Sequence, residues 1–224
     1  MRGQVVLNVK AQKKLIAYAL SKYIDFSKRV YIAYGSTNQE LLNYLGLSLG
    51  MLYVAGCVMD NKLNVTRERP PVVILDNGKL SNIENFEITK EDYFIKGANA
   101  LWYENGKKQA AVAASDINGG TYGNHYVKAA CRGAKVIIPV SHEKLIPYFV
   151  AASQNVDLAM GNKIAMLRLF YGEVFSEIEA FKFLFGVEAE VIASGGIFGN
   201  EGSVVFEIRG ERVKEAFDFV ESII

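Results

Sequence analysis

The sequence predicts an α/β protein in which a mostly parallel sheet has helices on both faces and is followed by a small C-terminal α+β unit. Segments with helical spacing of apolar residues alternate along the chain with short β-rich runs, which is typical of α/β sheets. Several of the runs are apolar on both faces, as expected for parallel strands covered by helices. The chain has 224 residues, of which 50% are hydrophobic and 22% charged. This composition suits a globular protein with a sizeable core.

The predicted helices are amphipathic. In residues 11–24, Leu15, Ile16 and Leu20 recur at helical intervals and form one apolar face. Further helices are expected over residues 37–47, 121–132 and 142–154.

The predicted strands are rich in β-branched and aromatic residues and are bounded by glycine or polar residues. The last four of them are apolar on both faces, which favours a parallel arrangement. These strands are expected over residues 29–36, 50–59, 70–76, 92–98, 109–115 and 134–140.

The pattern changes near residue 162. A strand at 164–172, a helix at 172–186, two alternating strands at 187–194 and 202–210, and a closing helix at 211–224 suit a small α+β unit with an antiparallel pair. We therefore predict a Rossmann-like α/β domain over residues 1–160 and a small α+β subdomain, resembling half of a ferredoxin-like fold, over residues 161–224.

The composition argues against several classes of protein. The net charge is +1 and no basic face is interleaved with aromatic residues, so we expect no nucleic-acid partner. Two cysteines without close spacing and two histidines are a poor supply of metal ligands, so we expect no metal and no other cofactor. No signal peptide or long apolar run is present, which predicts a cytoplasmic protein that does not enter a membrane.

The first candidate loop directly follows VYIA, the apolar part of the strand predicted at residues 29–36. Gly35 allows a tight turn, and Ser36, Thr37 and the free N–H groups of the following helix can bind a phosphate or carboxylate. An alternative stays open, because Thr37 and Glu40 also have the spacing of an ordinary capping box.

The second candidate loop is the stretch DINGGTYGNHY, which joins the strand at 109–115 to the helix at 121–132. Its glycines and threonine can form a nest of backbone donors around an anion, and a basic residue on the next helical turns can reach the same ligand. A merely solvated connection is the alternative. The residues expected to bind the ligand here are Gly119, Gly120, Thr121 and Lys128, with His125 beside them.

The third candidate is the segment that ends the strand at residues 92–98. Lys96 and Gly97 offer a cation and open space above the strand end, and Asn99 offers an uncharged amide. Glu104 follows as a carboxylate candidate. Its position before Asn-Gly also suits a simple hairpin turn, and this is the alternative.

The order of these motifs resembles the superfamily that contains ribose-5-phosphate isomerase, glucosamine-6-phosphate deaminase, CoA transferases and initiation-factor-2B-like proteins. The resemblance covers about residues 25–150 and depends on Gly35-Ser36-Thr37, on DYFIKGANAL, on the glycine/threonine loop and on AKVIIPV. It implies that the first loop binds a phosphate or a CoA portion. Asn99 stands where the isomerases have a catalytic aspartate, and an amide cannot take up a proton as a base.

These observations predict a protein that binds a small, sugar-phosphate-like anion and is an isomerase or a related enzyme. A non-catalytic metabolite sensor or assembly subunit and a CoA transferase with Glu104 as nucleophile are the alternatives. Self-association into a homo-oligomer is expected in each case. The candidates for catalysis are Lys96, Asn99, Glu104, Asp116 and His125.

Overall fold

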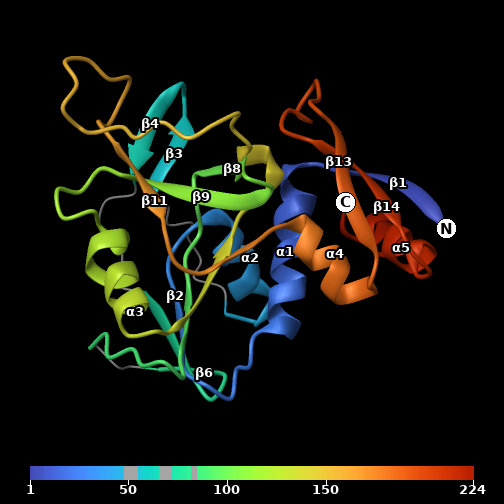
Figure 1. Cartoon of the computed structure of the whole chain (residues 1–224), viewed down its shortest axis with the longest axis horizontal. Coiled ribbons are helices and arrows are strands. Elements are labelled where there is room, and N and C mark those ends of the chain that lie inside the picture. The colour runs from blue at the N-terminus through green and yellow to red at the C-terminus, as the bar shows by residue number, and fades with distance from the viewer. Residues whose placement is uncertain (48–54, 66–71, 82–84) are drawn as a thin grey trace.

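The computed structural model describes residues 1–47, 55–65, 72–81 and 85–224 (Figure 1). The helices form where the sequence has amphipathic periodicity and a residue suited to start them. Asn8, for example, accepts a hydrogen bond from the backbone N–H of Ala11 and so caps the first helix. The helices are α1 (Val9–Tyr23), α2 (Ser36–Tyr44), α3 (Val127–Cys131), α4 (Glu177–Phe185) and α5 (Val213–Ile223).

A six-stranded mixed sheet forms the centre of the molecule. Its first four strands in spatial order are parallel, whereas the last two are antiparallel to their neighbours. The spatial order is β12 (Glu173–Phe175), β10 (Lys135–Pro139), β7 (Tyr93–Ile95), β2 (Val30–Ile32), β5 (Val73–Asp76) and β6 (Lys79–Leu80).

The remaining sheets are small and antiparallel. One consists of β8 (Ala100–Glu104), β9 (Lys107–Ala114) and β11 (Ala165–Leu169), and β3 (Ala55–Met59) pairs with β4 (Lys62–Val65). Asn105 and Gly106 join β8 to β9 with φ angles of 50° and 73°. A two-residue turn can only join antiparallel strands.

The predicted fold class, a mostly parallel Rossmann-like sheet with helices on both faces, is therefore wrong. The strand predicted at 70–76 is antiparallel to β2, and the strand predicted at 109–115 belongs to a separate antiparallel sheet. Apolarity on both faces shows that a strand is buried, but it does not show the direction of that strand. Part of the strand predicted at 50–59 lies outside the described residues.

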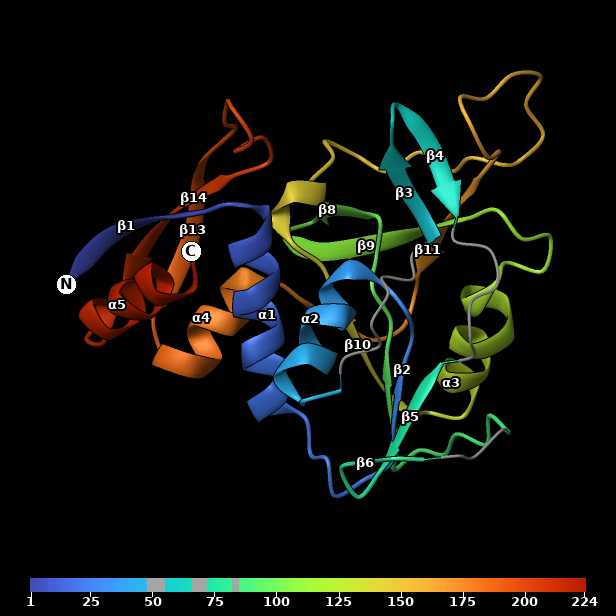
Figure 2. The ribbon, with the colours of Figure 1, turned by 180° about the vertical axis from the view of Figure 1, so that it is seen from behind.

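Two hydrophobic cores lie on opposite faces of the central sheet. On one face Val30, Ile32 and Ile95 pack with residues of α1, α2 and α4. On the other face Tyr31 and Phe94 pack with residues of α3 and of the β8–β9 hairpin. One face is thus covered by helices, and the other by one short helix and an antiparallel sheet (Figure 2).

The C-terminal part of the chain forms a further antiparallel sheet in the order β1 (Arg2–Leu7), β14 (Val204–Arg209), β13 (Glu188–Ser194). The predicted antiparallel pair β13–β14 and the closing helix are confirmed. The first strand was not predicted, and it pairs with β14 along its whole length. The division at residue 160 stays a prediction, but this sheet also contains residues from the start of the chain (Figure 1).

The helix predicted at 142–154 is wrong, since only a 3₁₀ turn, His142–Lys144, forms there. Pro147 lacks an N–H group and disfavours a helical residue before it. The backbone N–H of Ile146 instead donates to the carbonyl of Leu101 in β8, at 2.8 Å. The turn therefore stays at the carboxyl end of β10, where it takes part in the site.

Candidate functional site

A cavity of about 530 Å³ lies at the carboxyl ends of three neighbouring parallel strands, β2, β7 and β10. Its size is within the range of small-molecule sites, about 300–1,000 Å³. In a parallel arrangement the segments after the strands meet at one edge, which is where ligands bind in such sheets. The cavity is lined by Lys13, Tyr34, Gly35, Ser36, Thr37, Asn38, Cys57, Val58, Lys96, Gly97, Ala98, Asn99, Ala113, Thr121, Glu143 and Lys144.

The segment after β2 brings the N-terminus of α2 to the cavity. The helix begins at Ser36, and Gly35 is the N-cap and gives no side-chain cap. The alternative that the sequence left open, a capping box at Thr37 and Glu40, is therefore wrong, because Thr37 already lies inside the helix. The first-turn N–H groups of a helix have no partner within the helix and attract anions.

Asn38 holds this segment in place. Its Nδ2 atom donates to the carbonyl of Ala33 at 2.6 Å and is 3.4 Å from the carbonyl oxygen of Ile95, so it joins the ends of β2 and β7. The side chain is 1% exposed, and its Oδ1 atom has no hydrogen-bond partner among the described residues. A buried polar atom without a partner is unusual in a folded protein.

The segment after β7 supplies a cation and an amide. The Nζ atom of Lys96 lies 3.2 Å from the carbonyl oxygen of Gly97, and both residues line the cavity. The Oδ1 atom of Asn99 accepts the backbone N–H of Ala113 at 3.0 Å. Asn99 thus connects this segment to β9 by a hydrogen bond. This structural role requires only that its side chain accepts a hydrogen bond.

The 3₁₀ turn after β10 adds two charged residues that were not predicted as site residues. Glu143 pairs with Lys13 of α1, with 3.0 Å between Oε1 and Nζ. Lys144 donates through Nζ to the carbonyl of Ala98 at 2.8 Å. The pKa of Lys144 is lowered to about 8, mainly by burial; Glu143 opposes this shift and Lys13 contributes to it. Three lysines therefore line one cavity with a single carboxylate among its described lining residues.

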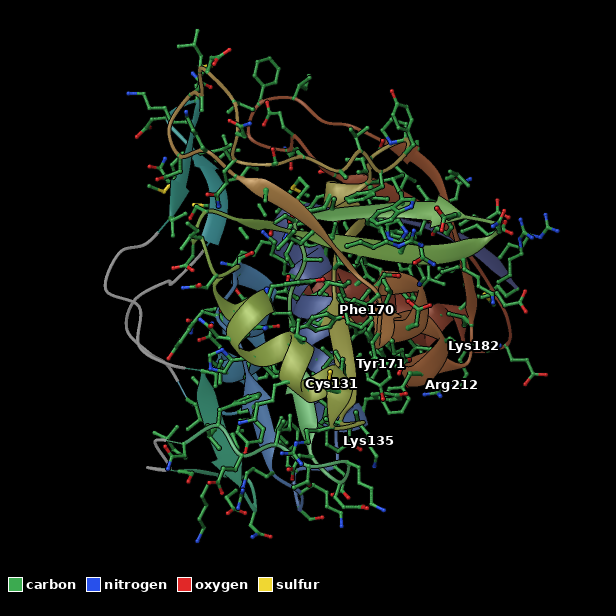
Figure 3. The ribbon with its side chains drawn as sticks, turned by 60° about the vertical axis from the view of Figure 1, so that its left-hand side comes forward. Cys131, Lys135, Phe170, Tyr171, Lys182 and Arg212 are labelled. Atoms are coloured by element: carbon green, nitrogen blue, oxygen red, sulfur yellow. The ribbon has the colours of Figure 1, made fainter. Side chains whose placement is uncertain are left out.

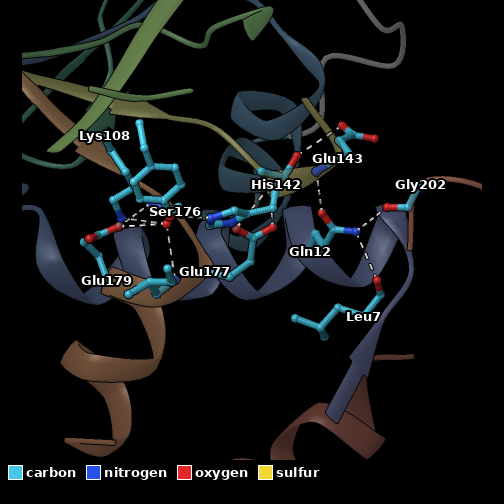
Figure 4. A network of polar contacts seen from close by, with 12 residues as sticks. Leu7, Gln12, Lys108, His142, Glu143, Ser176, Glu177, Glu179 and Gly202 are labelled. Carbon is cyan, nitrogen blue, oxygen red and sulfur yellow. Dashed lines mark hydrogen bonds and ion pairs between the residues drawn. The ribbon is translucent and has the colours of Figure 1, made fainter. Parts of the chain in front are cut away.

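A buried hydrogen-bond network fixes this turn (Figure 4). Nδ1 of His142 lies 2.6 Å from Oε2 of Glu177, and the carboxylate also accepts the backbone N–H of His142. Since a carboxylate only accepts, Nδ1 donates, and Nε2 lies 3.0 Å from the hydroxyl oxygen of Tyr103. His142 and Glu177 are 4% and 0% exposed.

A second anchor of the turn comes from α1. The buried Gln12 accepts the backbone N–H of Glu143 through Oε1 at 3.0 Å. Its Nε2 atom donates to the carbonyls of Leu7 and Gly202 at 3.0 and 2.8 Å (Figure 4). The turn is thereby attached to both β1 and the β13–β14 connection.

Of the second predicted loop, Thr121 lines the cavity, and its side chain does not cap the turn that follows. Asp116, Gly119 and Gly120 form a turn of their own: Oδ1 of Asp116 is 3.4 Å from the N atom of Gly120, and the carbonyl of Asp116 accepts from Gly119 at 2.9 Å. Because these amide groups have partners inside the loop, the expected nest around an anion is not formed by them.

His125 and Lys128 do not line the cavity. The helix begins with a π-helical turn, Tyr122–Tyr126, and the His125 ring packs edge-on against Phe86 with 4.6 Å between centroids. Burial lowers the pKa of His125. Lys128 donates to the carbonyl of Phe86 at 2.6 Å. The structure therefore separates both residues from the three segments that meet at the cavity.

Glu104 is also absent from the cavity lining. It is the last residue of β8, it is exposed, and it forms an ion pair with Arg168 of β11. The hairpin turn that the sequence left open as the alternative is confirmed by the pairing of Glu104 with Lys107.

A smaller cavity of about 440 Å³ adjoins the first, and the two share Lys13 and Ser36. Within the described segments no group of three or more His, Cys, Asp or Glu side chains is placed to hold a metal ion. Both cysteines are free, and Cys131 is exposed on α3 (Figure 3). None of the helices described is long and apolar enough to cross a membrane.

Comparisons with known proteins identify no relative. No protein-family model matches the chain, and neither the curated proteins nor the solved structures that were compared with it include a match.

Proposed function

We propose that the chain binds a small phosphorylated metabolite in the cavity at the ends of β2, β7 and β10. The observation that supports this most is the meeting of an α2 N-terminus without a side-chain cap with Lys13, Lys96 and Lys144. Backbone N–H groups at a helix N-terminus and nearby ammonium groups are the donors that bind phosphate oxygens in proteins.

In this proposal the N–H groups of the first α2 turn and the hydroxyl of Ser36 bind the phosphate, and Lys96 balances its charge. Thr121 adds a hydroxyl from the opposite segment. The adjoining cavity gives room for a substrate longer than a triose.

A non-catalytic metabolite sensor is the second candidate. It is favoured by Asn99, whose carboxamide holds the backbone of Ala113 and cannot act as a base. The CoA-transferase alternative loses its support, because Glu104, the nucleophile it needs, is paired with Arg168 outside the cavity.

The binding proposal is tested by titration calorimetry and thermal shift with ribose 5-phosphate, glycerol 3-phosphate and inorganic phosphate. Replacing Lys96 by Met removes a charged donor, so affinity should fall about tenfold or more. Lys128→Met is the matched control, because it removes the same charge outside the cavity. Equal losses in both variants, or no binding to the unmodified chain, would contradict the proposal.

A further inference from the structure

Lys144 has a position that differs from that of the other lysines in the cavity. Its Nζ atom donates to a backbone carbonyl, that of Ala98, at 2.8 Å. The carboxylate nearest in sequence, Glu143, is instead paired with Lys13. A backbone carbonyl accepts from an ammonium group and also, more weakly, from a neutral amine, so this contact holds the proton on Lys144 less firmly than a paired carboxylate would.

The surroundings of Lys144 favour its neutral form. Burial disfavours the charge, and Lys13 on α1, which lines the same cavity, adds to this effect. Glu143 acts in the opposite direction but is shared with Lys13. Desolvation and neighbouring cations are the two conditions that activate lysine amines as nucleophiles.

The amine is also held in a fixed place. The turn that presents it is bonded through His142 to Glu177 and through Glu143 to Gln12, and both of these partners are fully buried. A nucleophile on an anchored turn is pre-organised for attack on a bound substrate.

We propose that Lys144 forms a Schiff base with the carbonyl carbon of a phosphorylated aldehyde or ketone. This inference rests on the anion site proposed above and names its substrate class. The neutral amine adds to the carbonyl carbon, a C–N bond forms and a carbinolamine results. Loss of one water, which carries away the carbonyl oxygen and the two amine hydrogens, gives the imine. No oxidant or reductant is needed.

The test is reductive trapping of the unmodified protein with glyceraldehyde 3-phosphate and cyanoborohydride at pH 8, followed by peptide mass spectrometry. A lysine of pKa about 8 is about half neutral at this pH, whereas a lysine of pKa 10.5 is less than about 1% neutral. Lys144 should therefore be labelled about tenfold or more faster than Lys182, which is exposed on α4 (Figure 3).

Two control ligands distinguish a failure of the Schiff-base proposal from a failure of the proposed anion site. Glycerol 3-phosphate has the phosphate but no carbonyl, so it should bind and slow the labelling of Lys144. Glyceraldehyde without phosphate should label Lys144 more slowly. If glycerol 3-phosphate binds but Lys144 reacts no faster than Lys182, the Schiff base is overturned and the anion site stands. If Lys144 reacts equally with both aldehydes and glycerol 3-phosphate neither binds nor protects, the phosphate site is overturned.

A variant gives an independent check. Lys144→Met should lose the adduct at position 144, whereas the labelling of the exposed Lys182 should be unchanged. An undiminished total of trapped aldehyde in this folded variant would overturn the assignment to Lys144.

Discussion

The Nζ atom of Lys13 lies 3.0 Å from the Oε1 atom of Glu143, and this ion pair joins α1 to the 3₁₀ turn after β10. Both side chains line the cavity, although they are far apart in the sequence. Glu143 forms its ion pair with Lys13, whereas the Nζ atom of Lys144 donates to the backbone carbonyl of Ala98. The electrostatic character of the site thus depends on a contact between a helix and a turn.

Thr121→Val should weaken the binding of inorganic phosphate about tenfold, because one hydrogen bond to a charged group is lost. The side chain does not cap the π-helical turn, so the free energy of unfolding should change little. Thr121→Ser retains the hydroxyl and should restore most of the affinity. Titration calorimetry of the three proteins checks this, and equal affinities in all of them would exclude Thr121 from the site.

Two glycines give a matched pair of substitutions. Gly97 has no heavy atom within 4 Å of an added Cβ, so Gly97→Ala should fold normally but place a methyl group at the cavity and weaken phosphate binding. Gly106 has a φ of 73° in the β8–β9 turn, so Gly106→Ala should destabilise the protein by about 1 kcal/mol. Its phosphate affinity should be unchanged. Chemical denaturation and calorimetry separate the two effects, and the reverse pattern would contradict this placement of the site.

The stability of the protein should rise between about pH 8 and pH 10.5 through Lys144. The pKa of Lys144 is about 8 in the folded chain and returns to 10.5 on unfolding. Within this window the unfolded state binds more protons, so the free energy of unfolding rises with pH. One pKa unit corresponds to about 1.4 kcal/mol. Lys144→Met should therefore show a smaller rise in urea denaturation over this window, and parallel pH profiles of the two proteins would contradict the assignment.

Glu177→Ala should be strongly destabilising. It leaves the backbone N–H and the Nδ1 atom of His142 without an acceptor in a buried site. We expect a loss of about 3 kcal/mol and a fall in Tm of roughly 6–12 °C. Glu215→Ala removes an exposed carboxylate of α5 and is the control, with little change in Tm expected. Similar melting temperatures for the two variants would show that the network does not fix the turn.

Part of the site was predictable because parallel strands bring the segments after them to one edge. Gly35, Ser36 and Gly97 directly follow strand patterns, and the structure places them on one cavity with Thr121. The four parallel strands β12, β10, β7 and β2 are enough to bring these segments to one edge of the sheet. The fold class as a whole was nevertheless predicted wrongly.

The other site residues depend on packing that a local pattern does not contain. Lys13 lies on α1, and the periodicity of a helix does not show in which direction it crosses the sheet. Lys144 was missed because the sequence predicted a helix at 142–154, where the structure has only a 3₁₀ turn. Local spacing also failed for His125, because a π-helical turn directs its side chain differently from an α-helix with the same start. The segment VSHEKLIP stands at the end of the strand at 134–140, just as the first and third candidate segments stand at the ends of their strands. This position could have identified Glu143 and Lys144 as site residues.

Binding of an anion at the start of α2 is tested most directly by titrating the ¹⁵N-labelled protein with inorganic phosphate and following the backbone amides by NMR. We expect the largest amide shifts at Ser36, Thr37, Asn38 and Gly97, and we expect them to saturate together. Shifts confined to other surfaces, such as the α3 region around Lys128, or no saturable shifts at all, would contradict it.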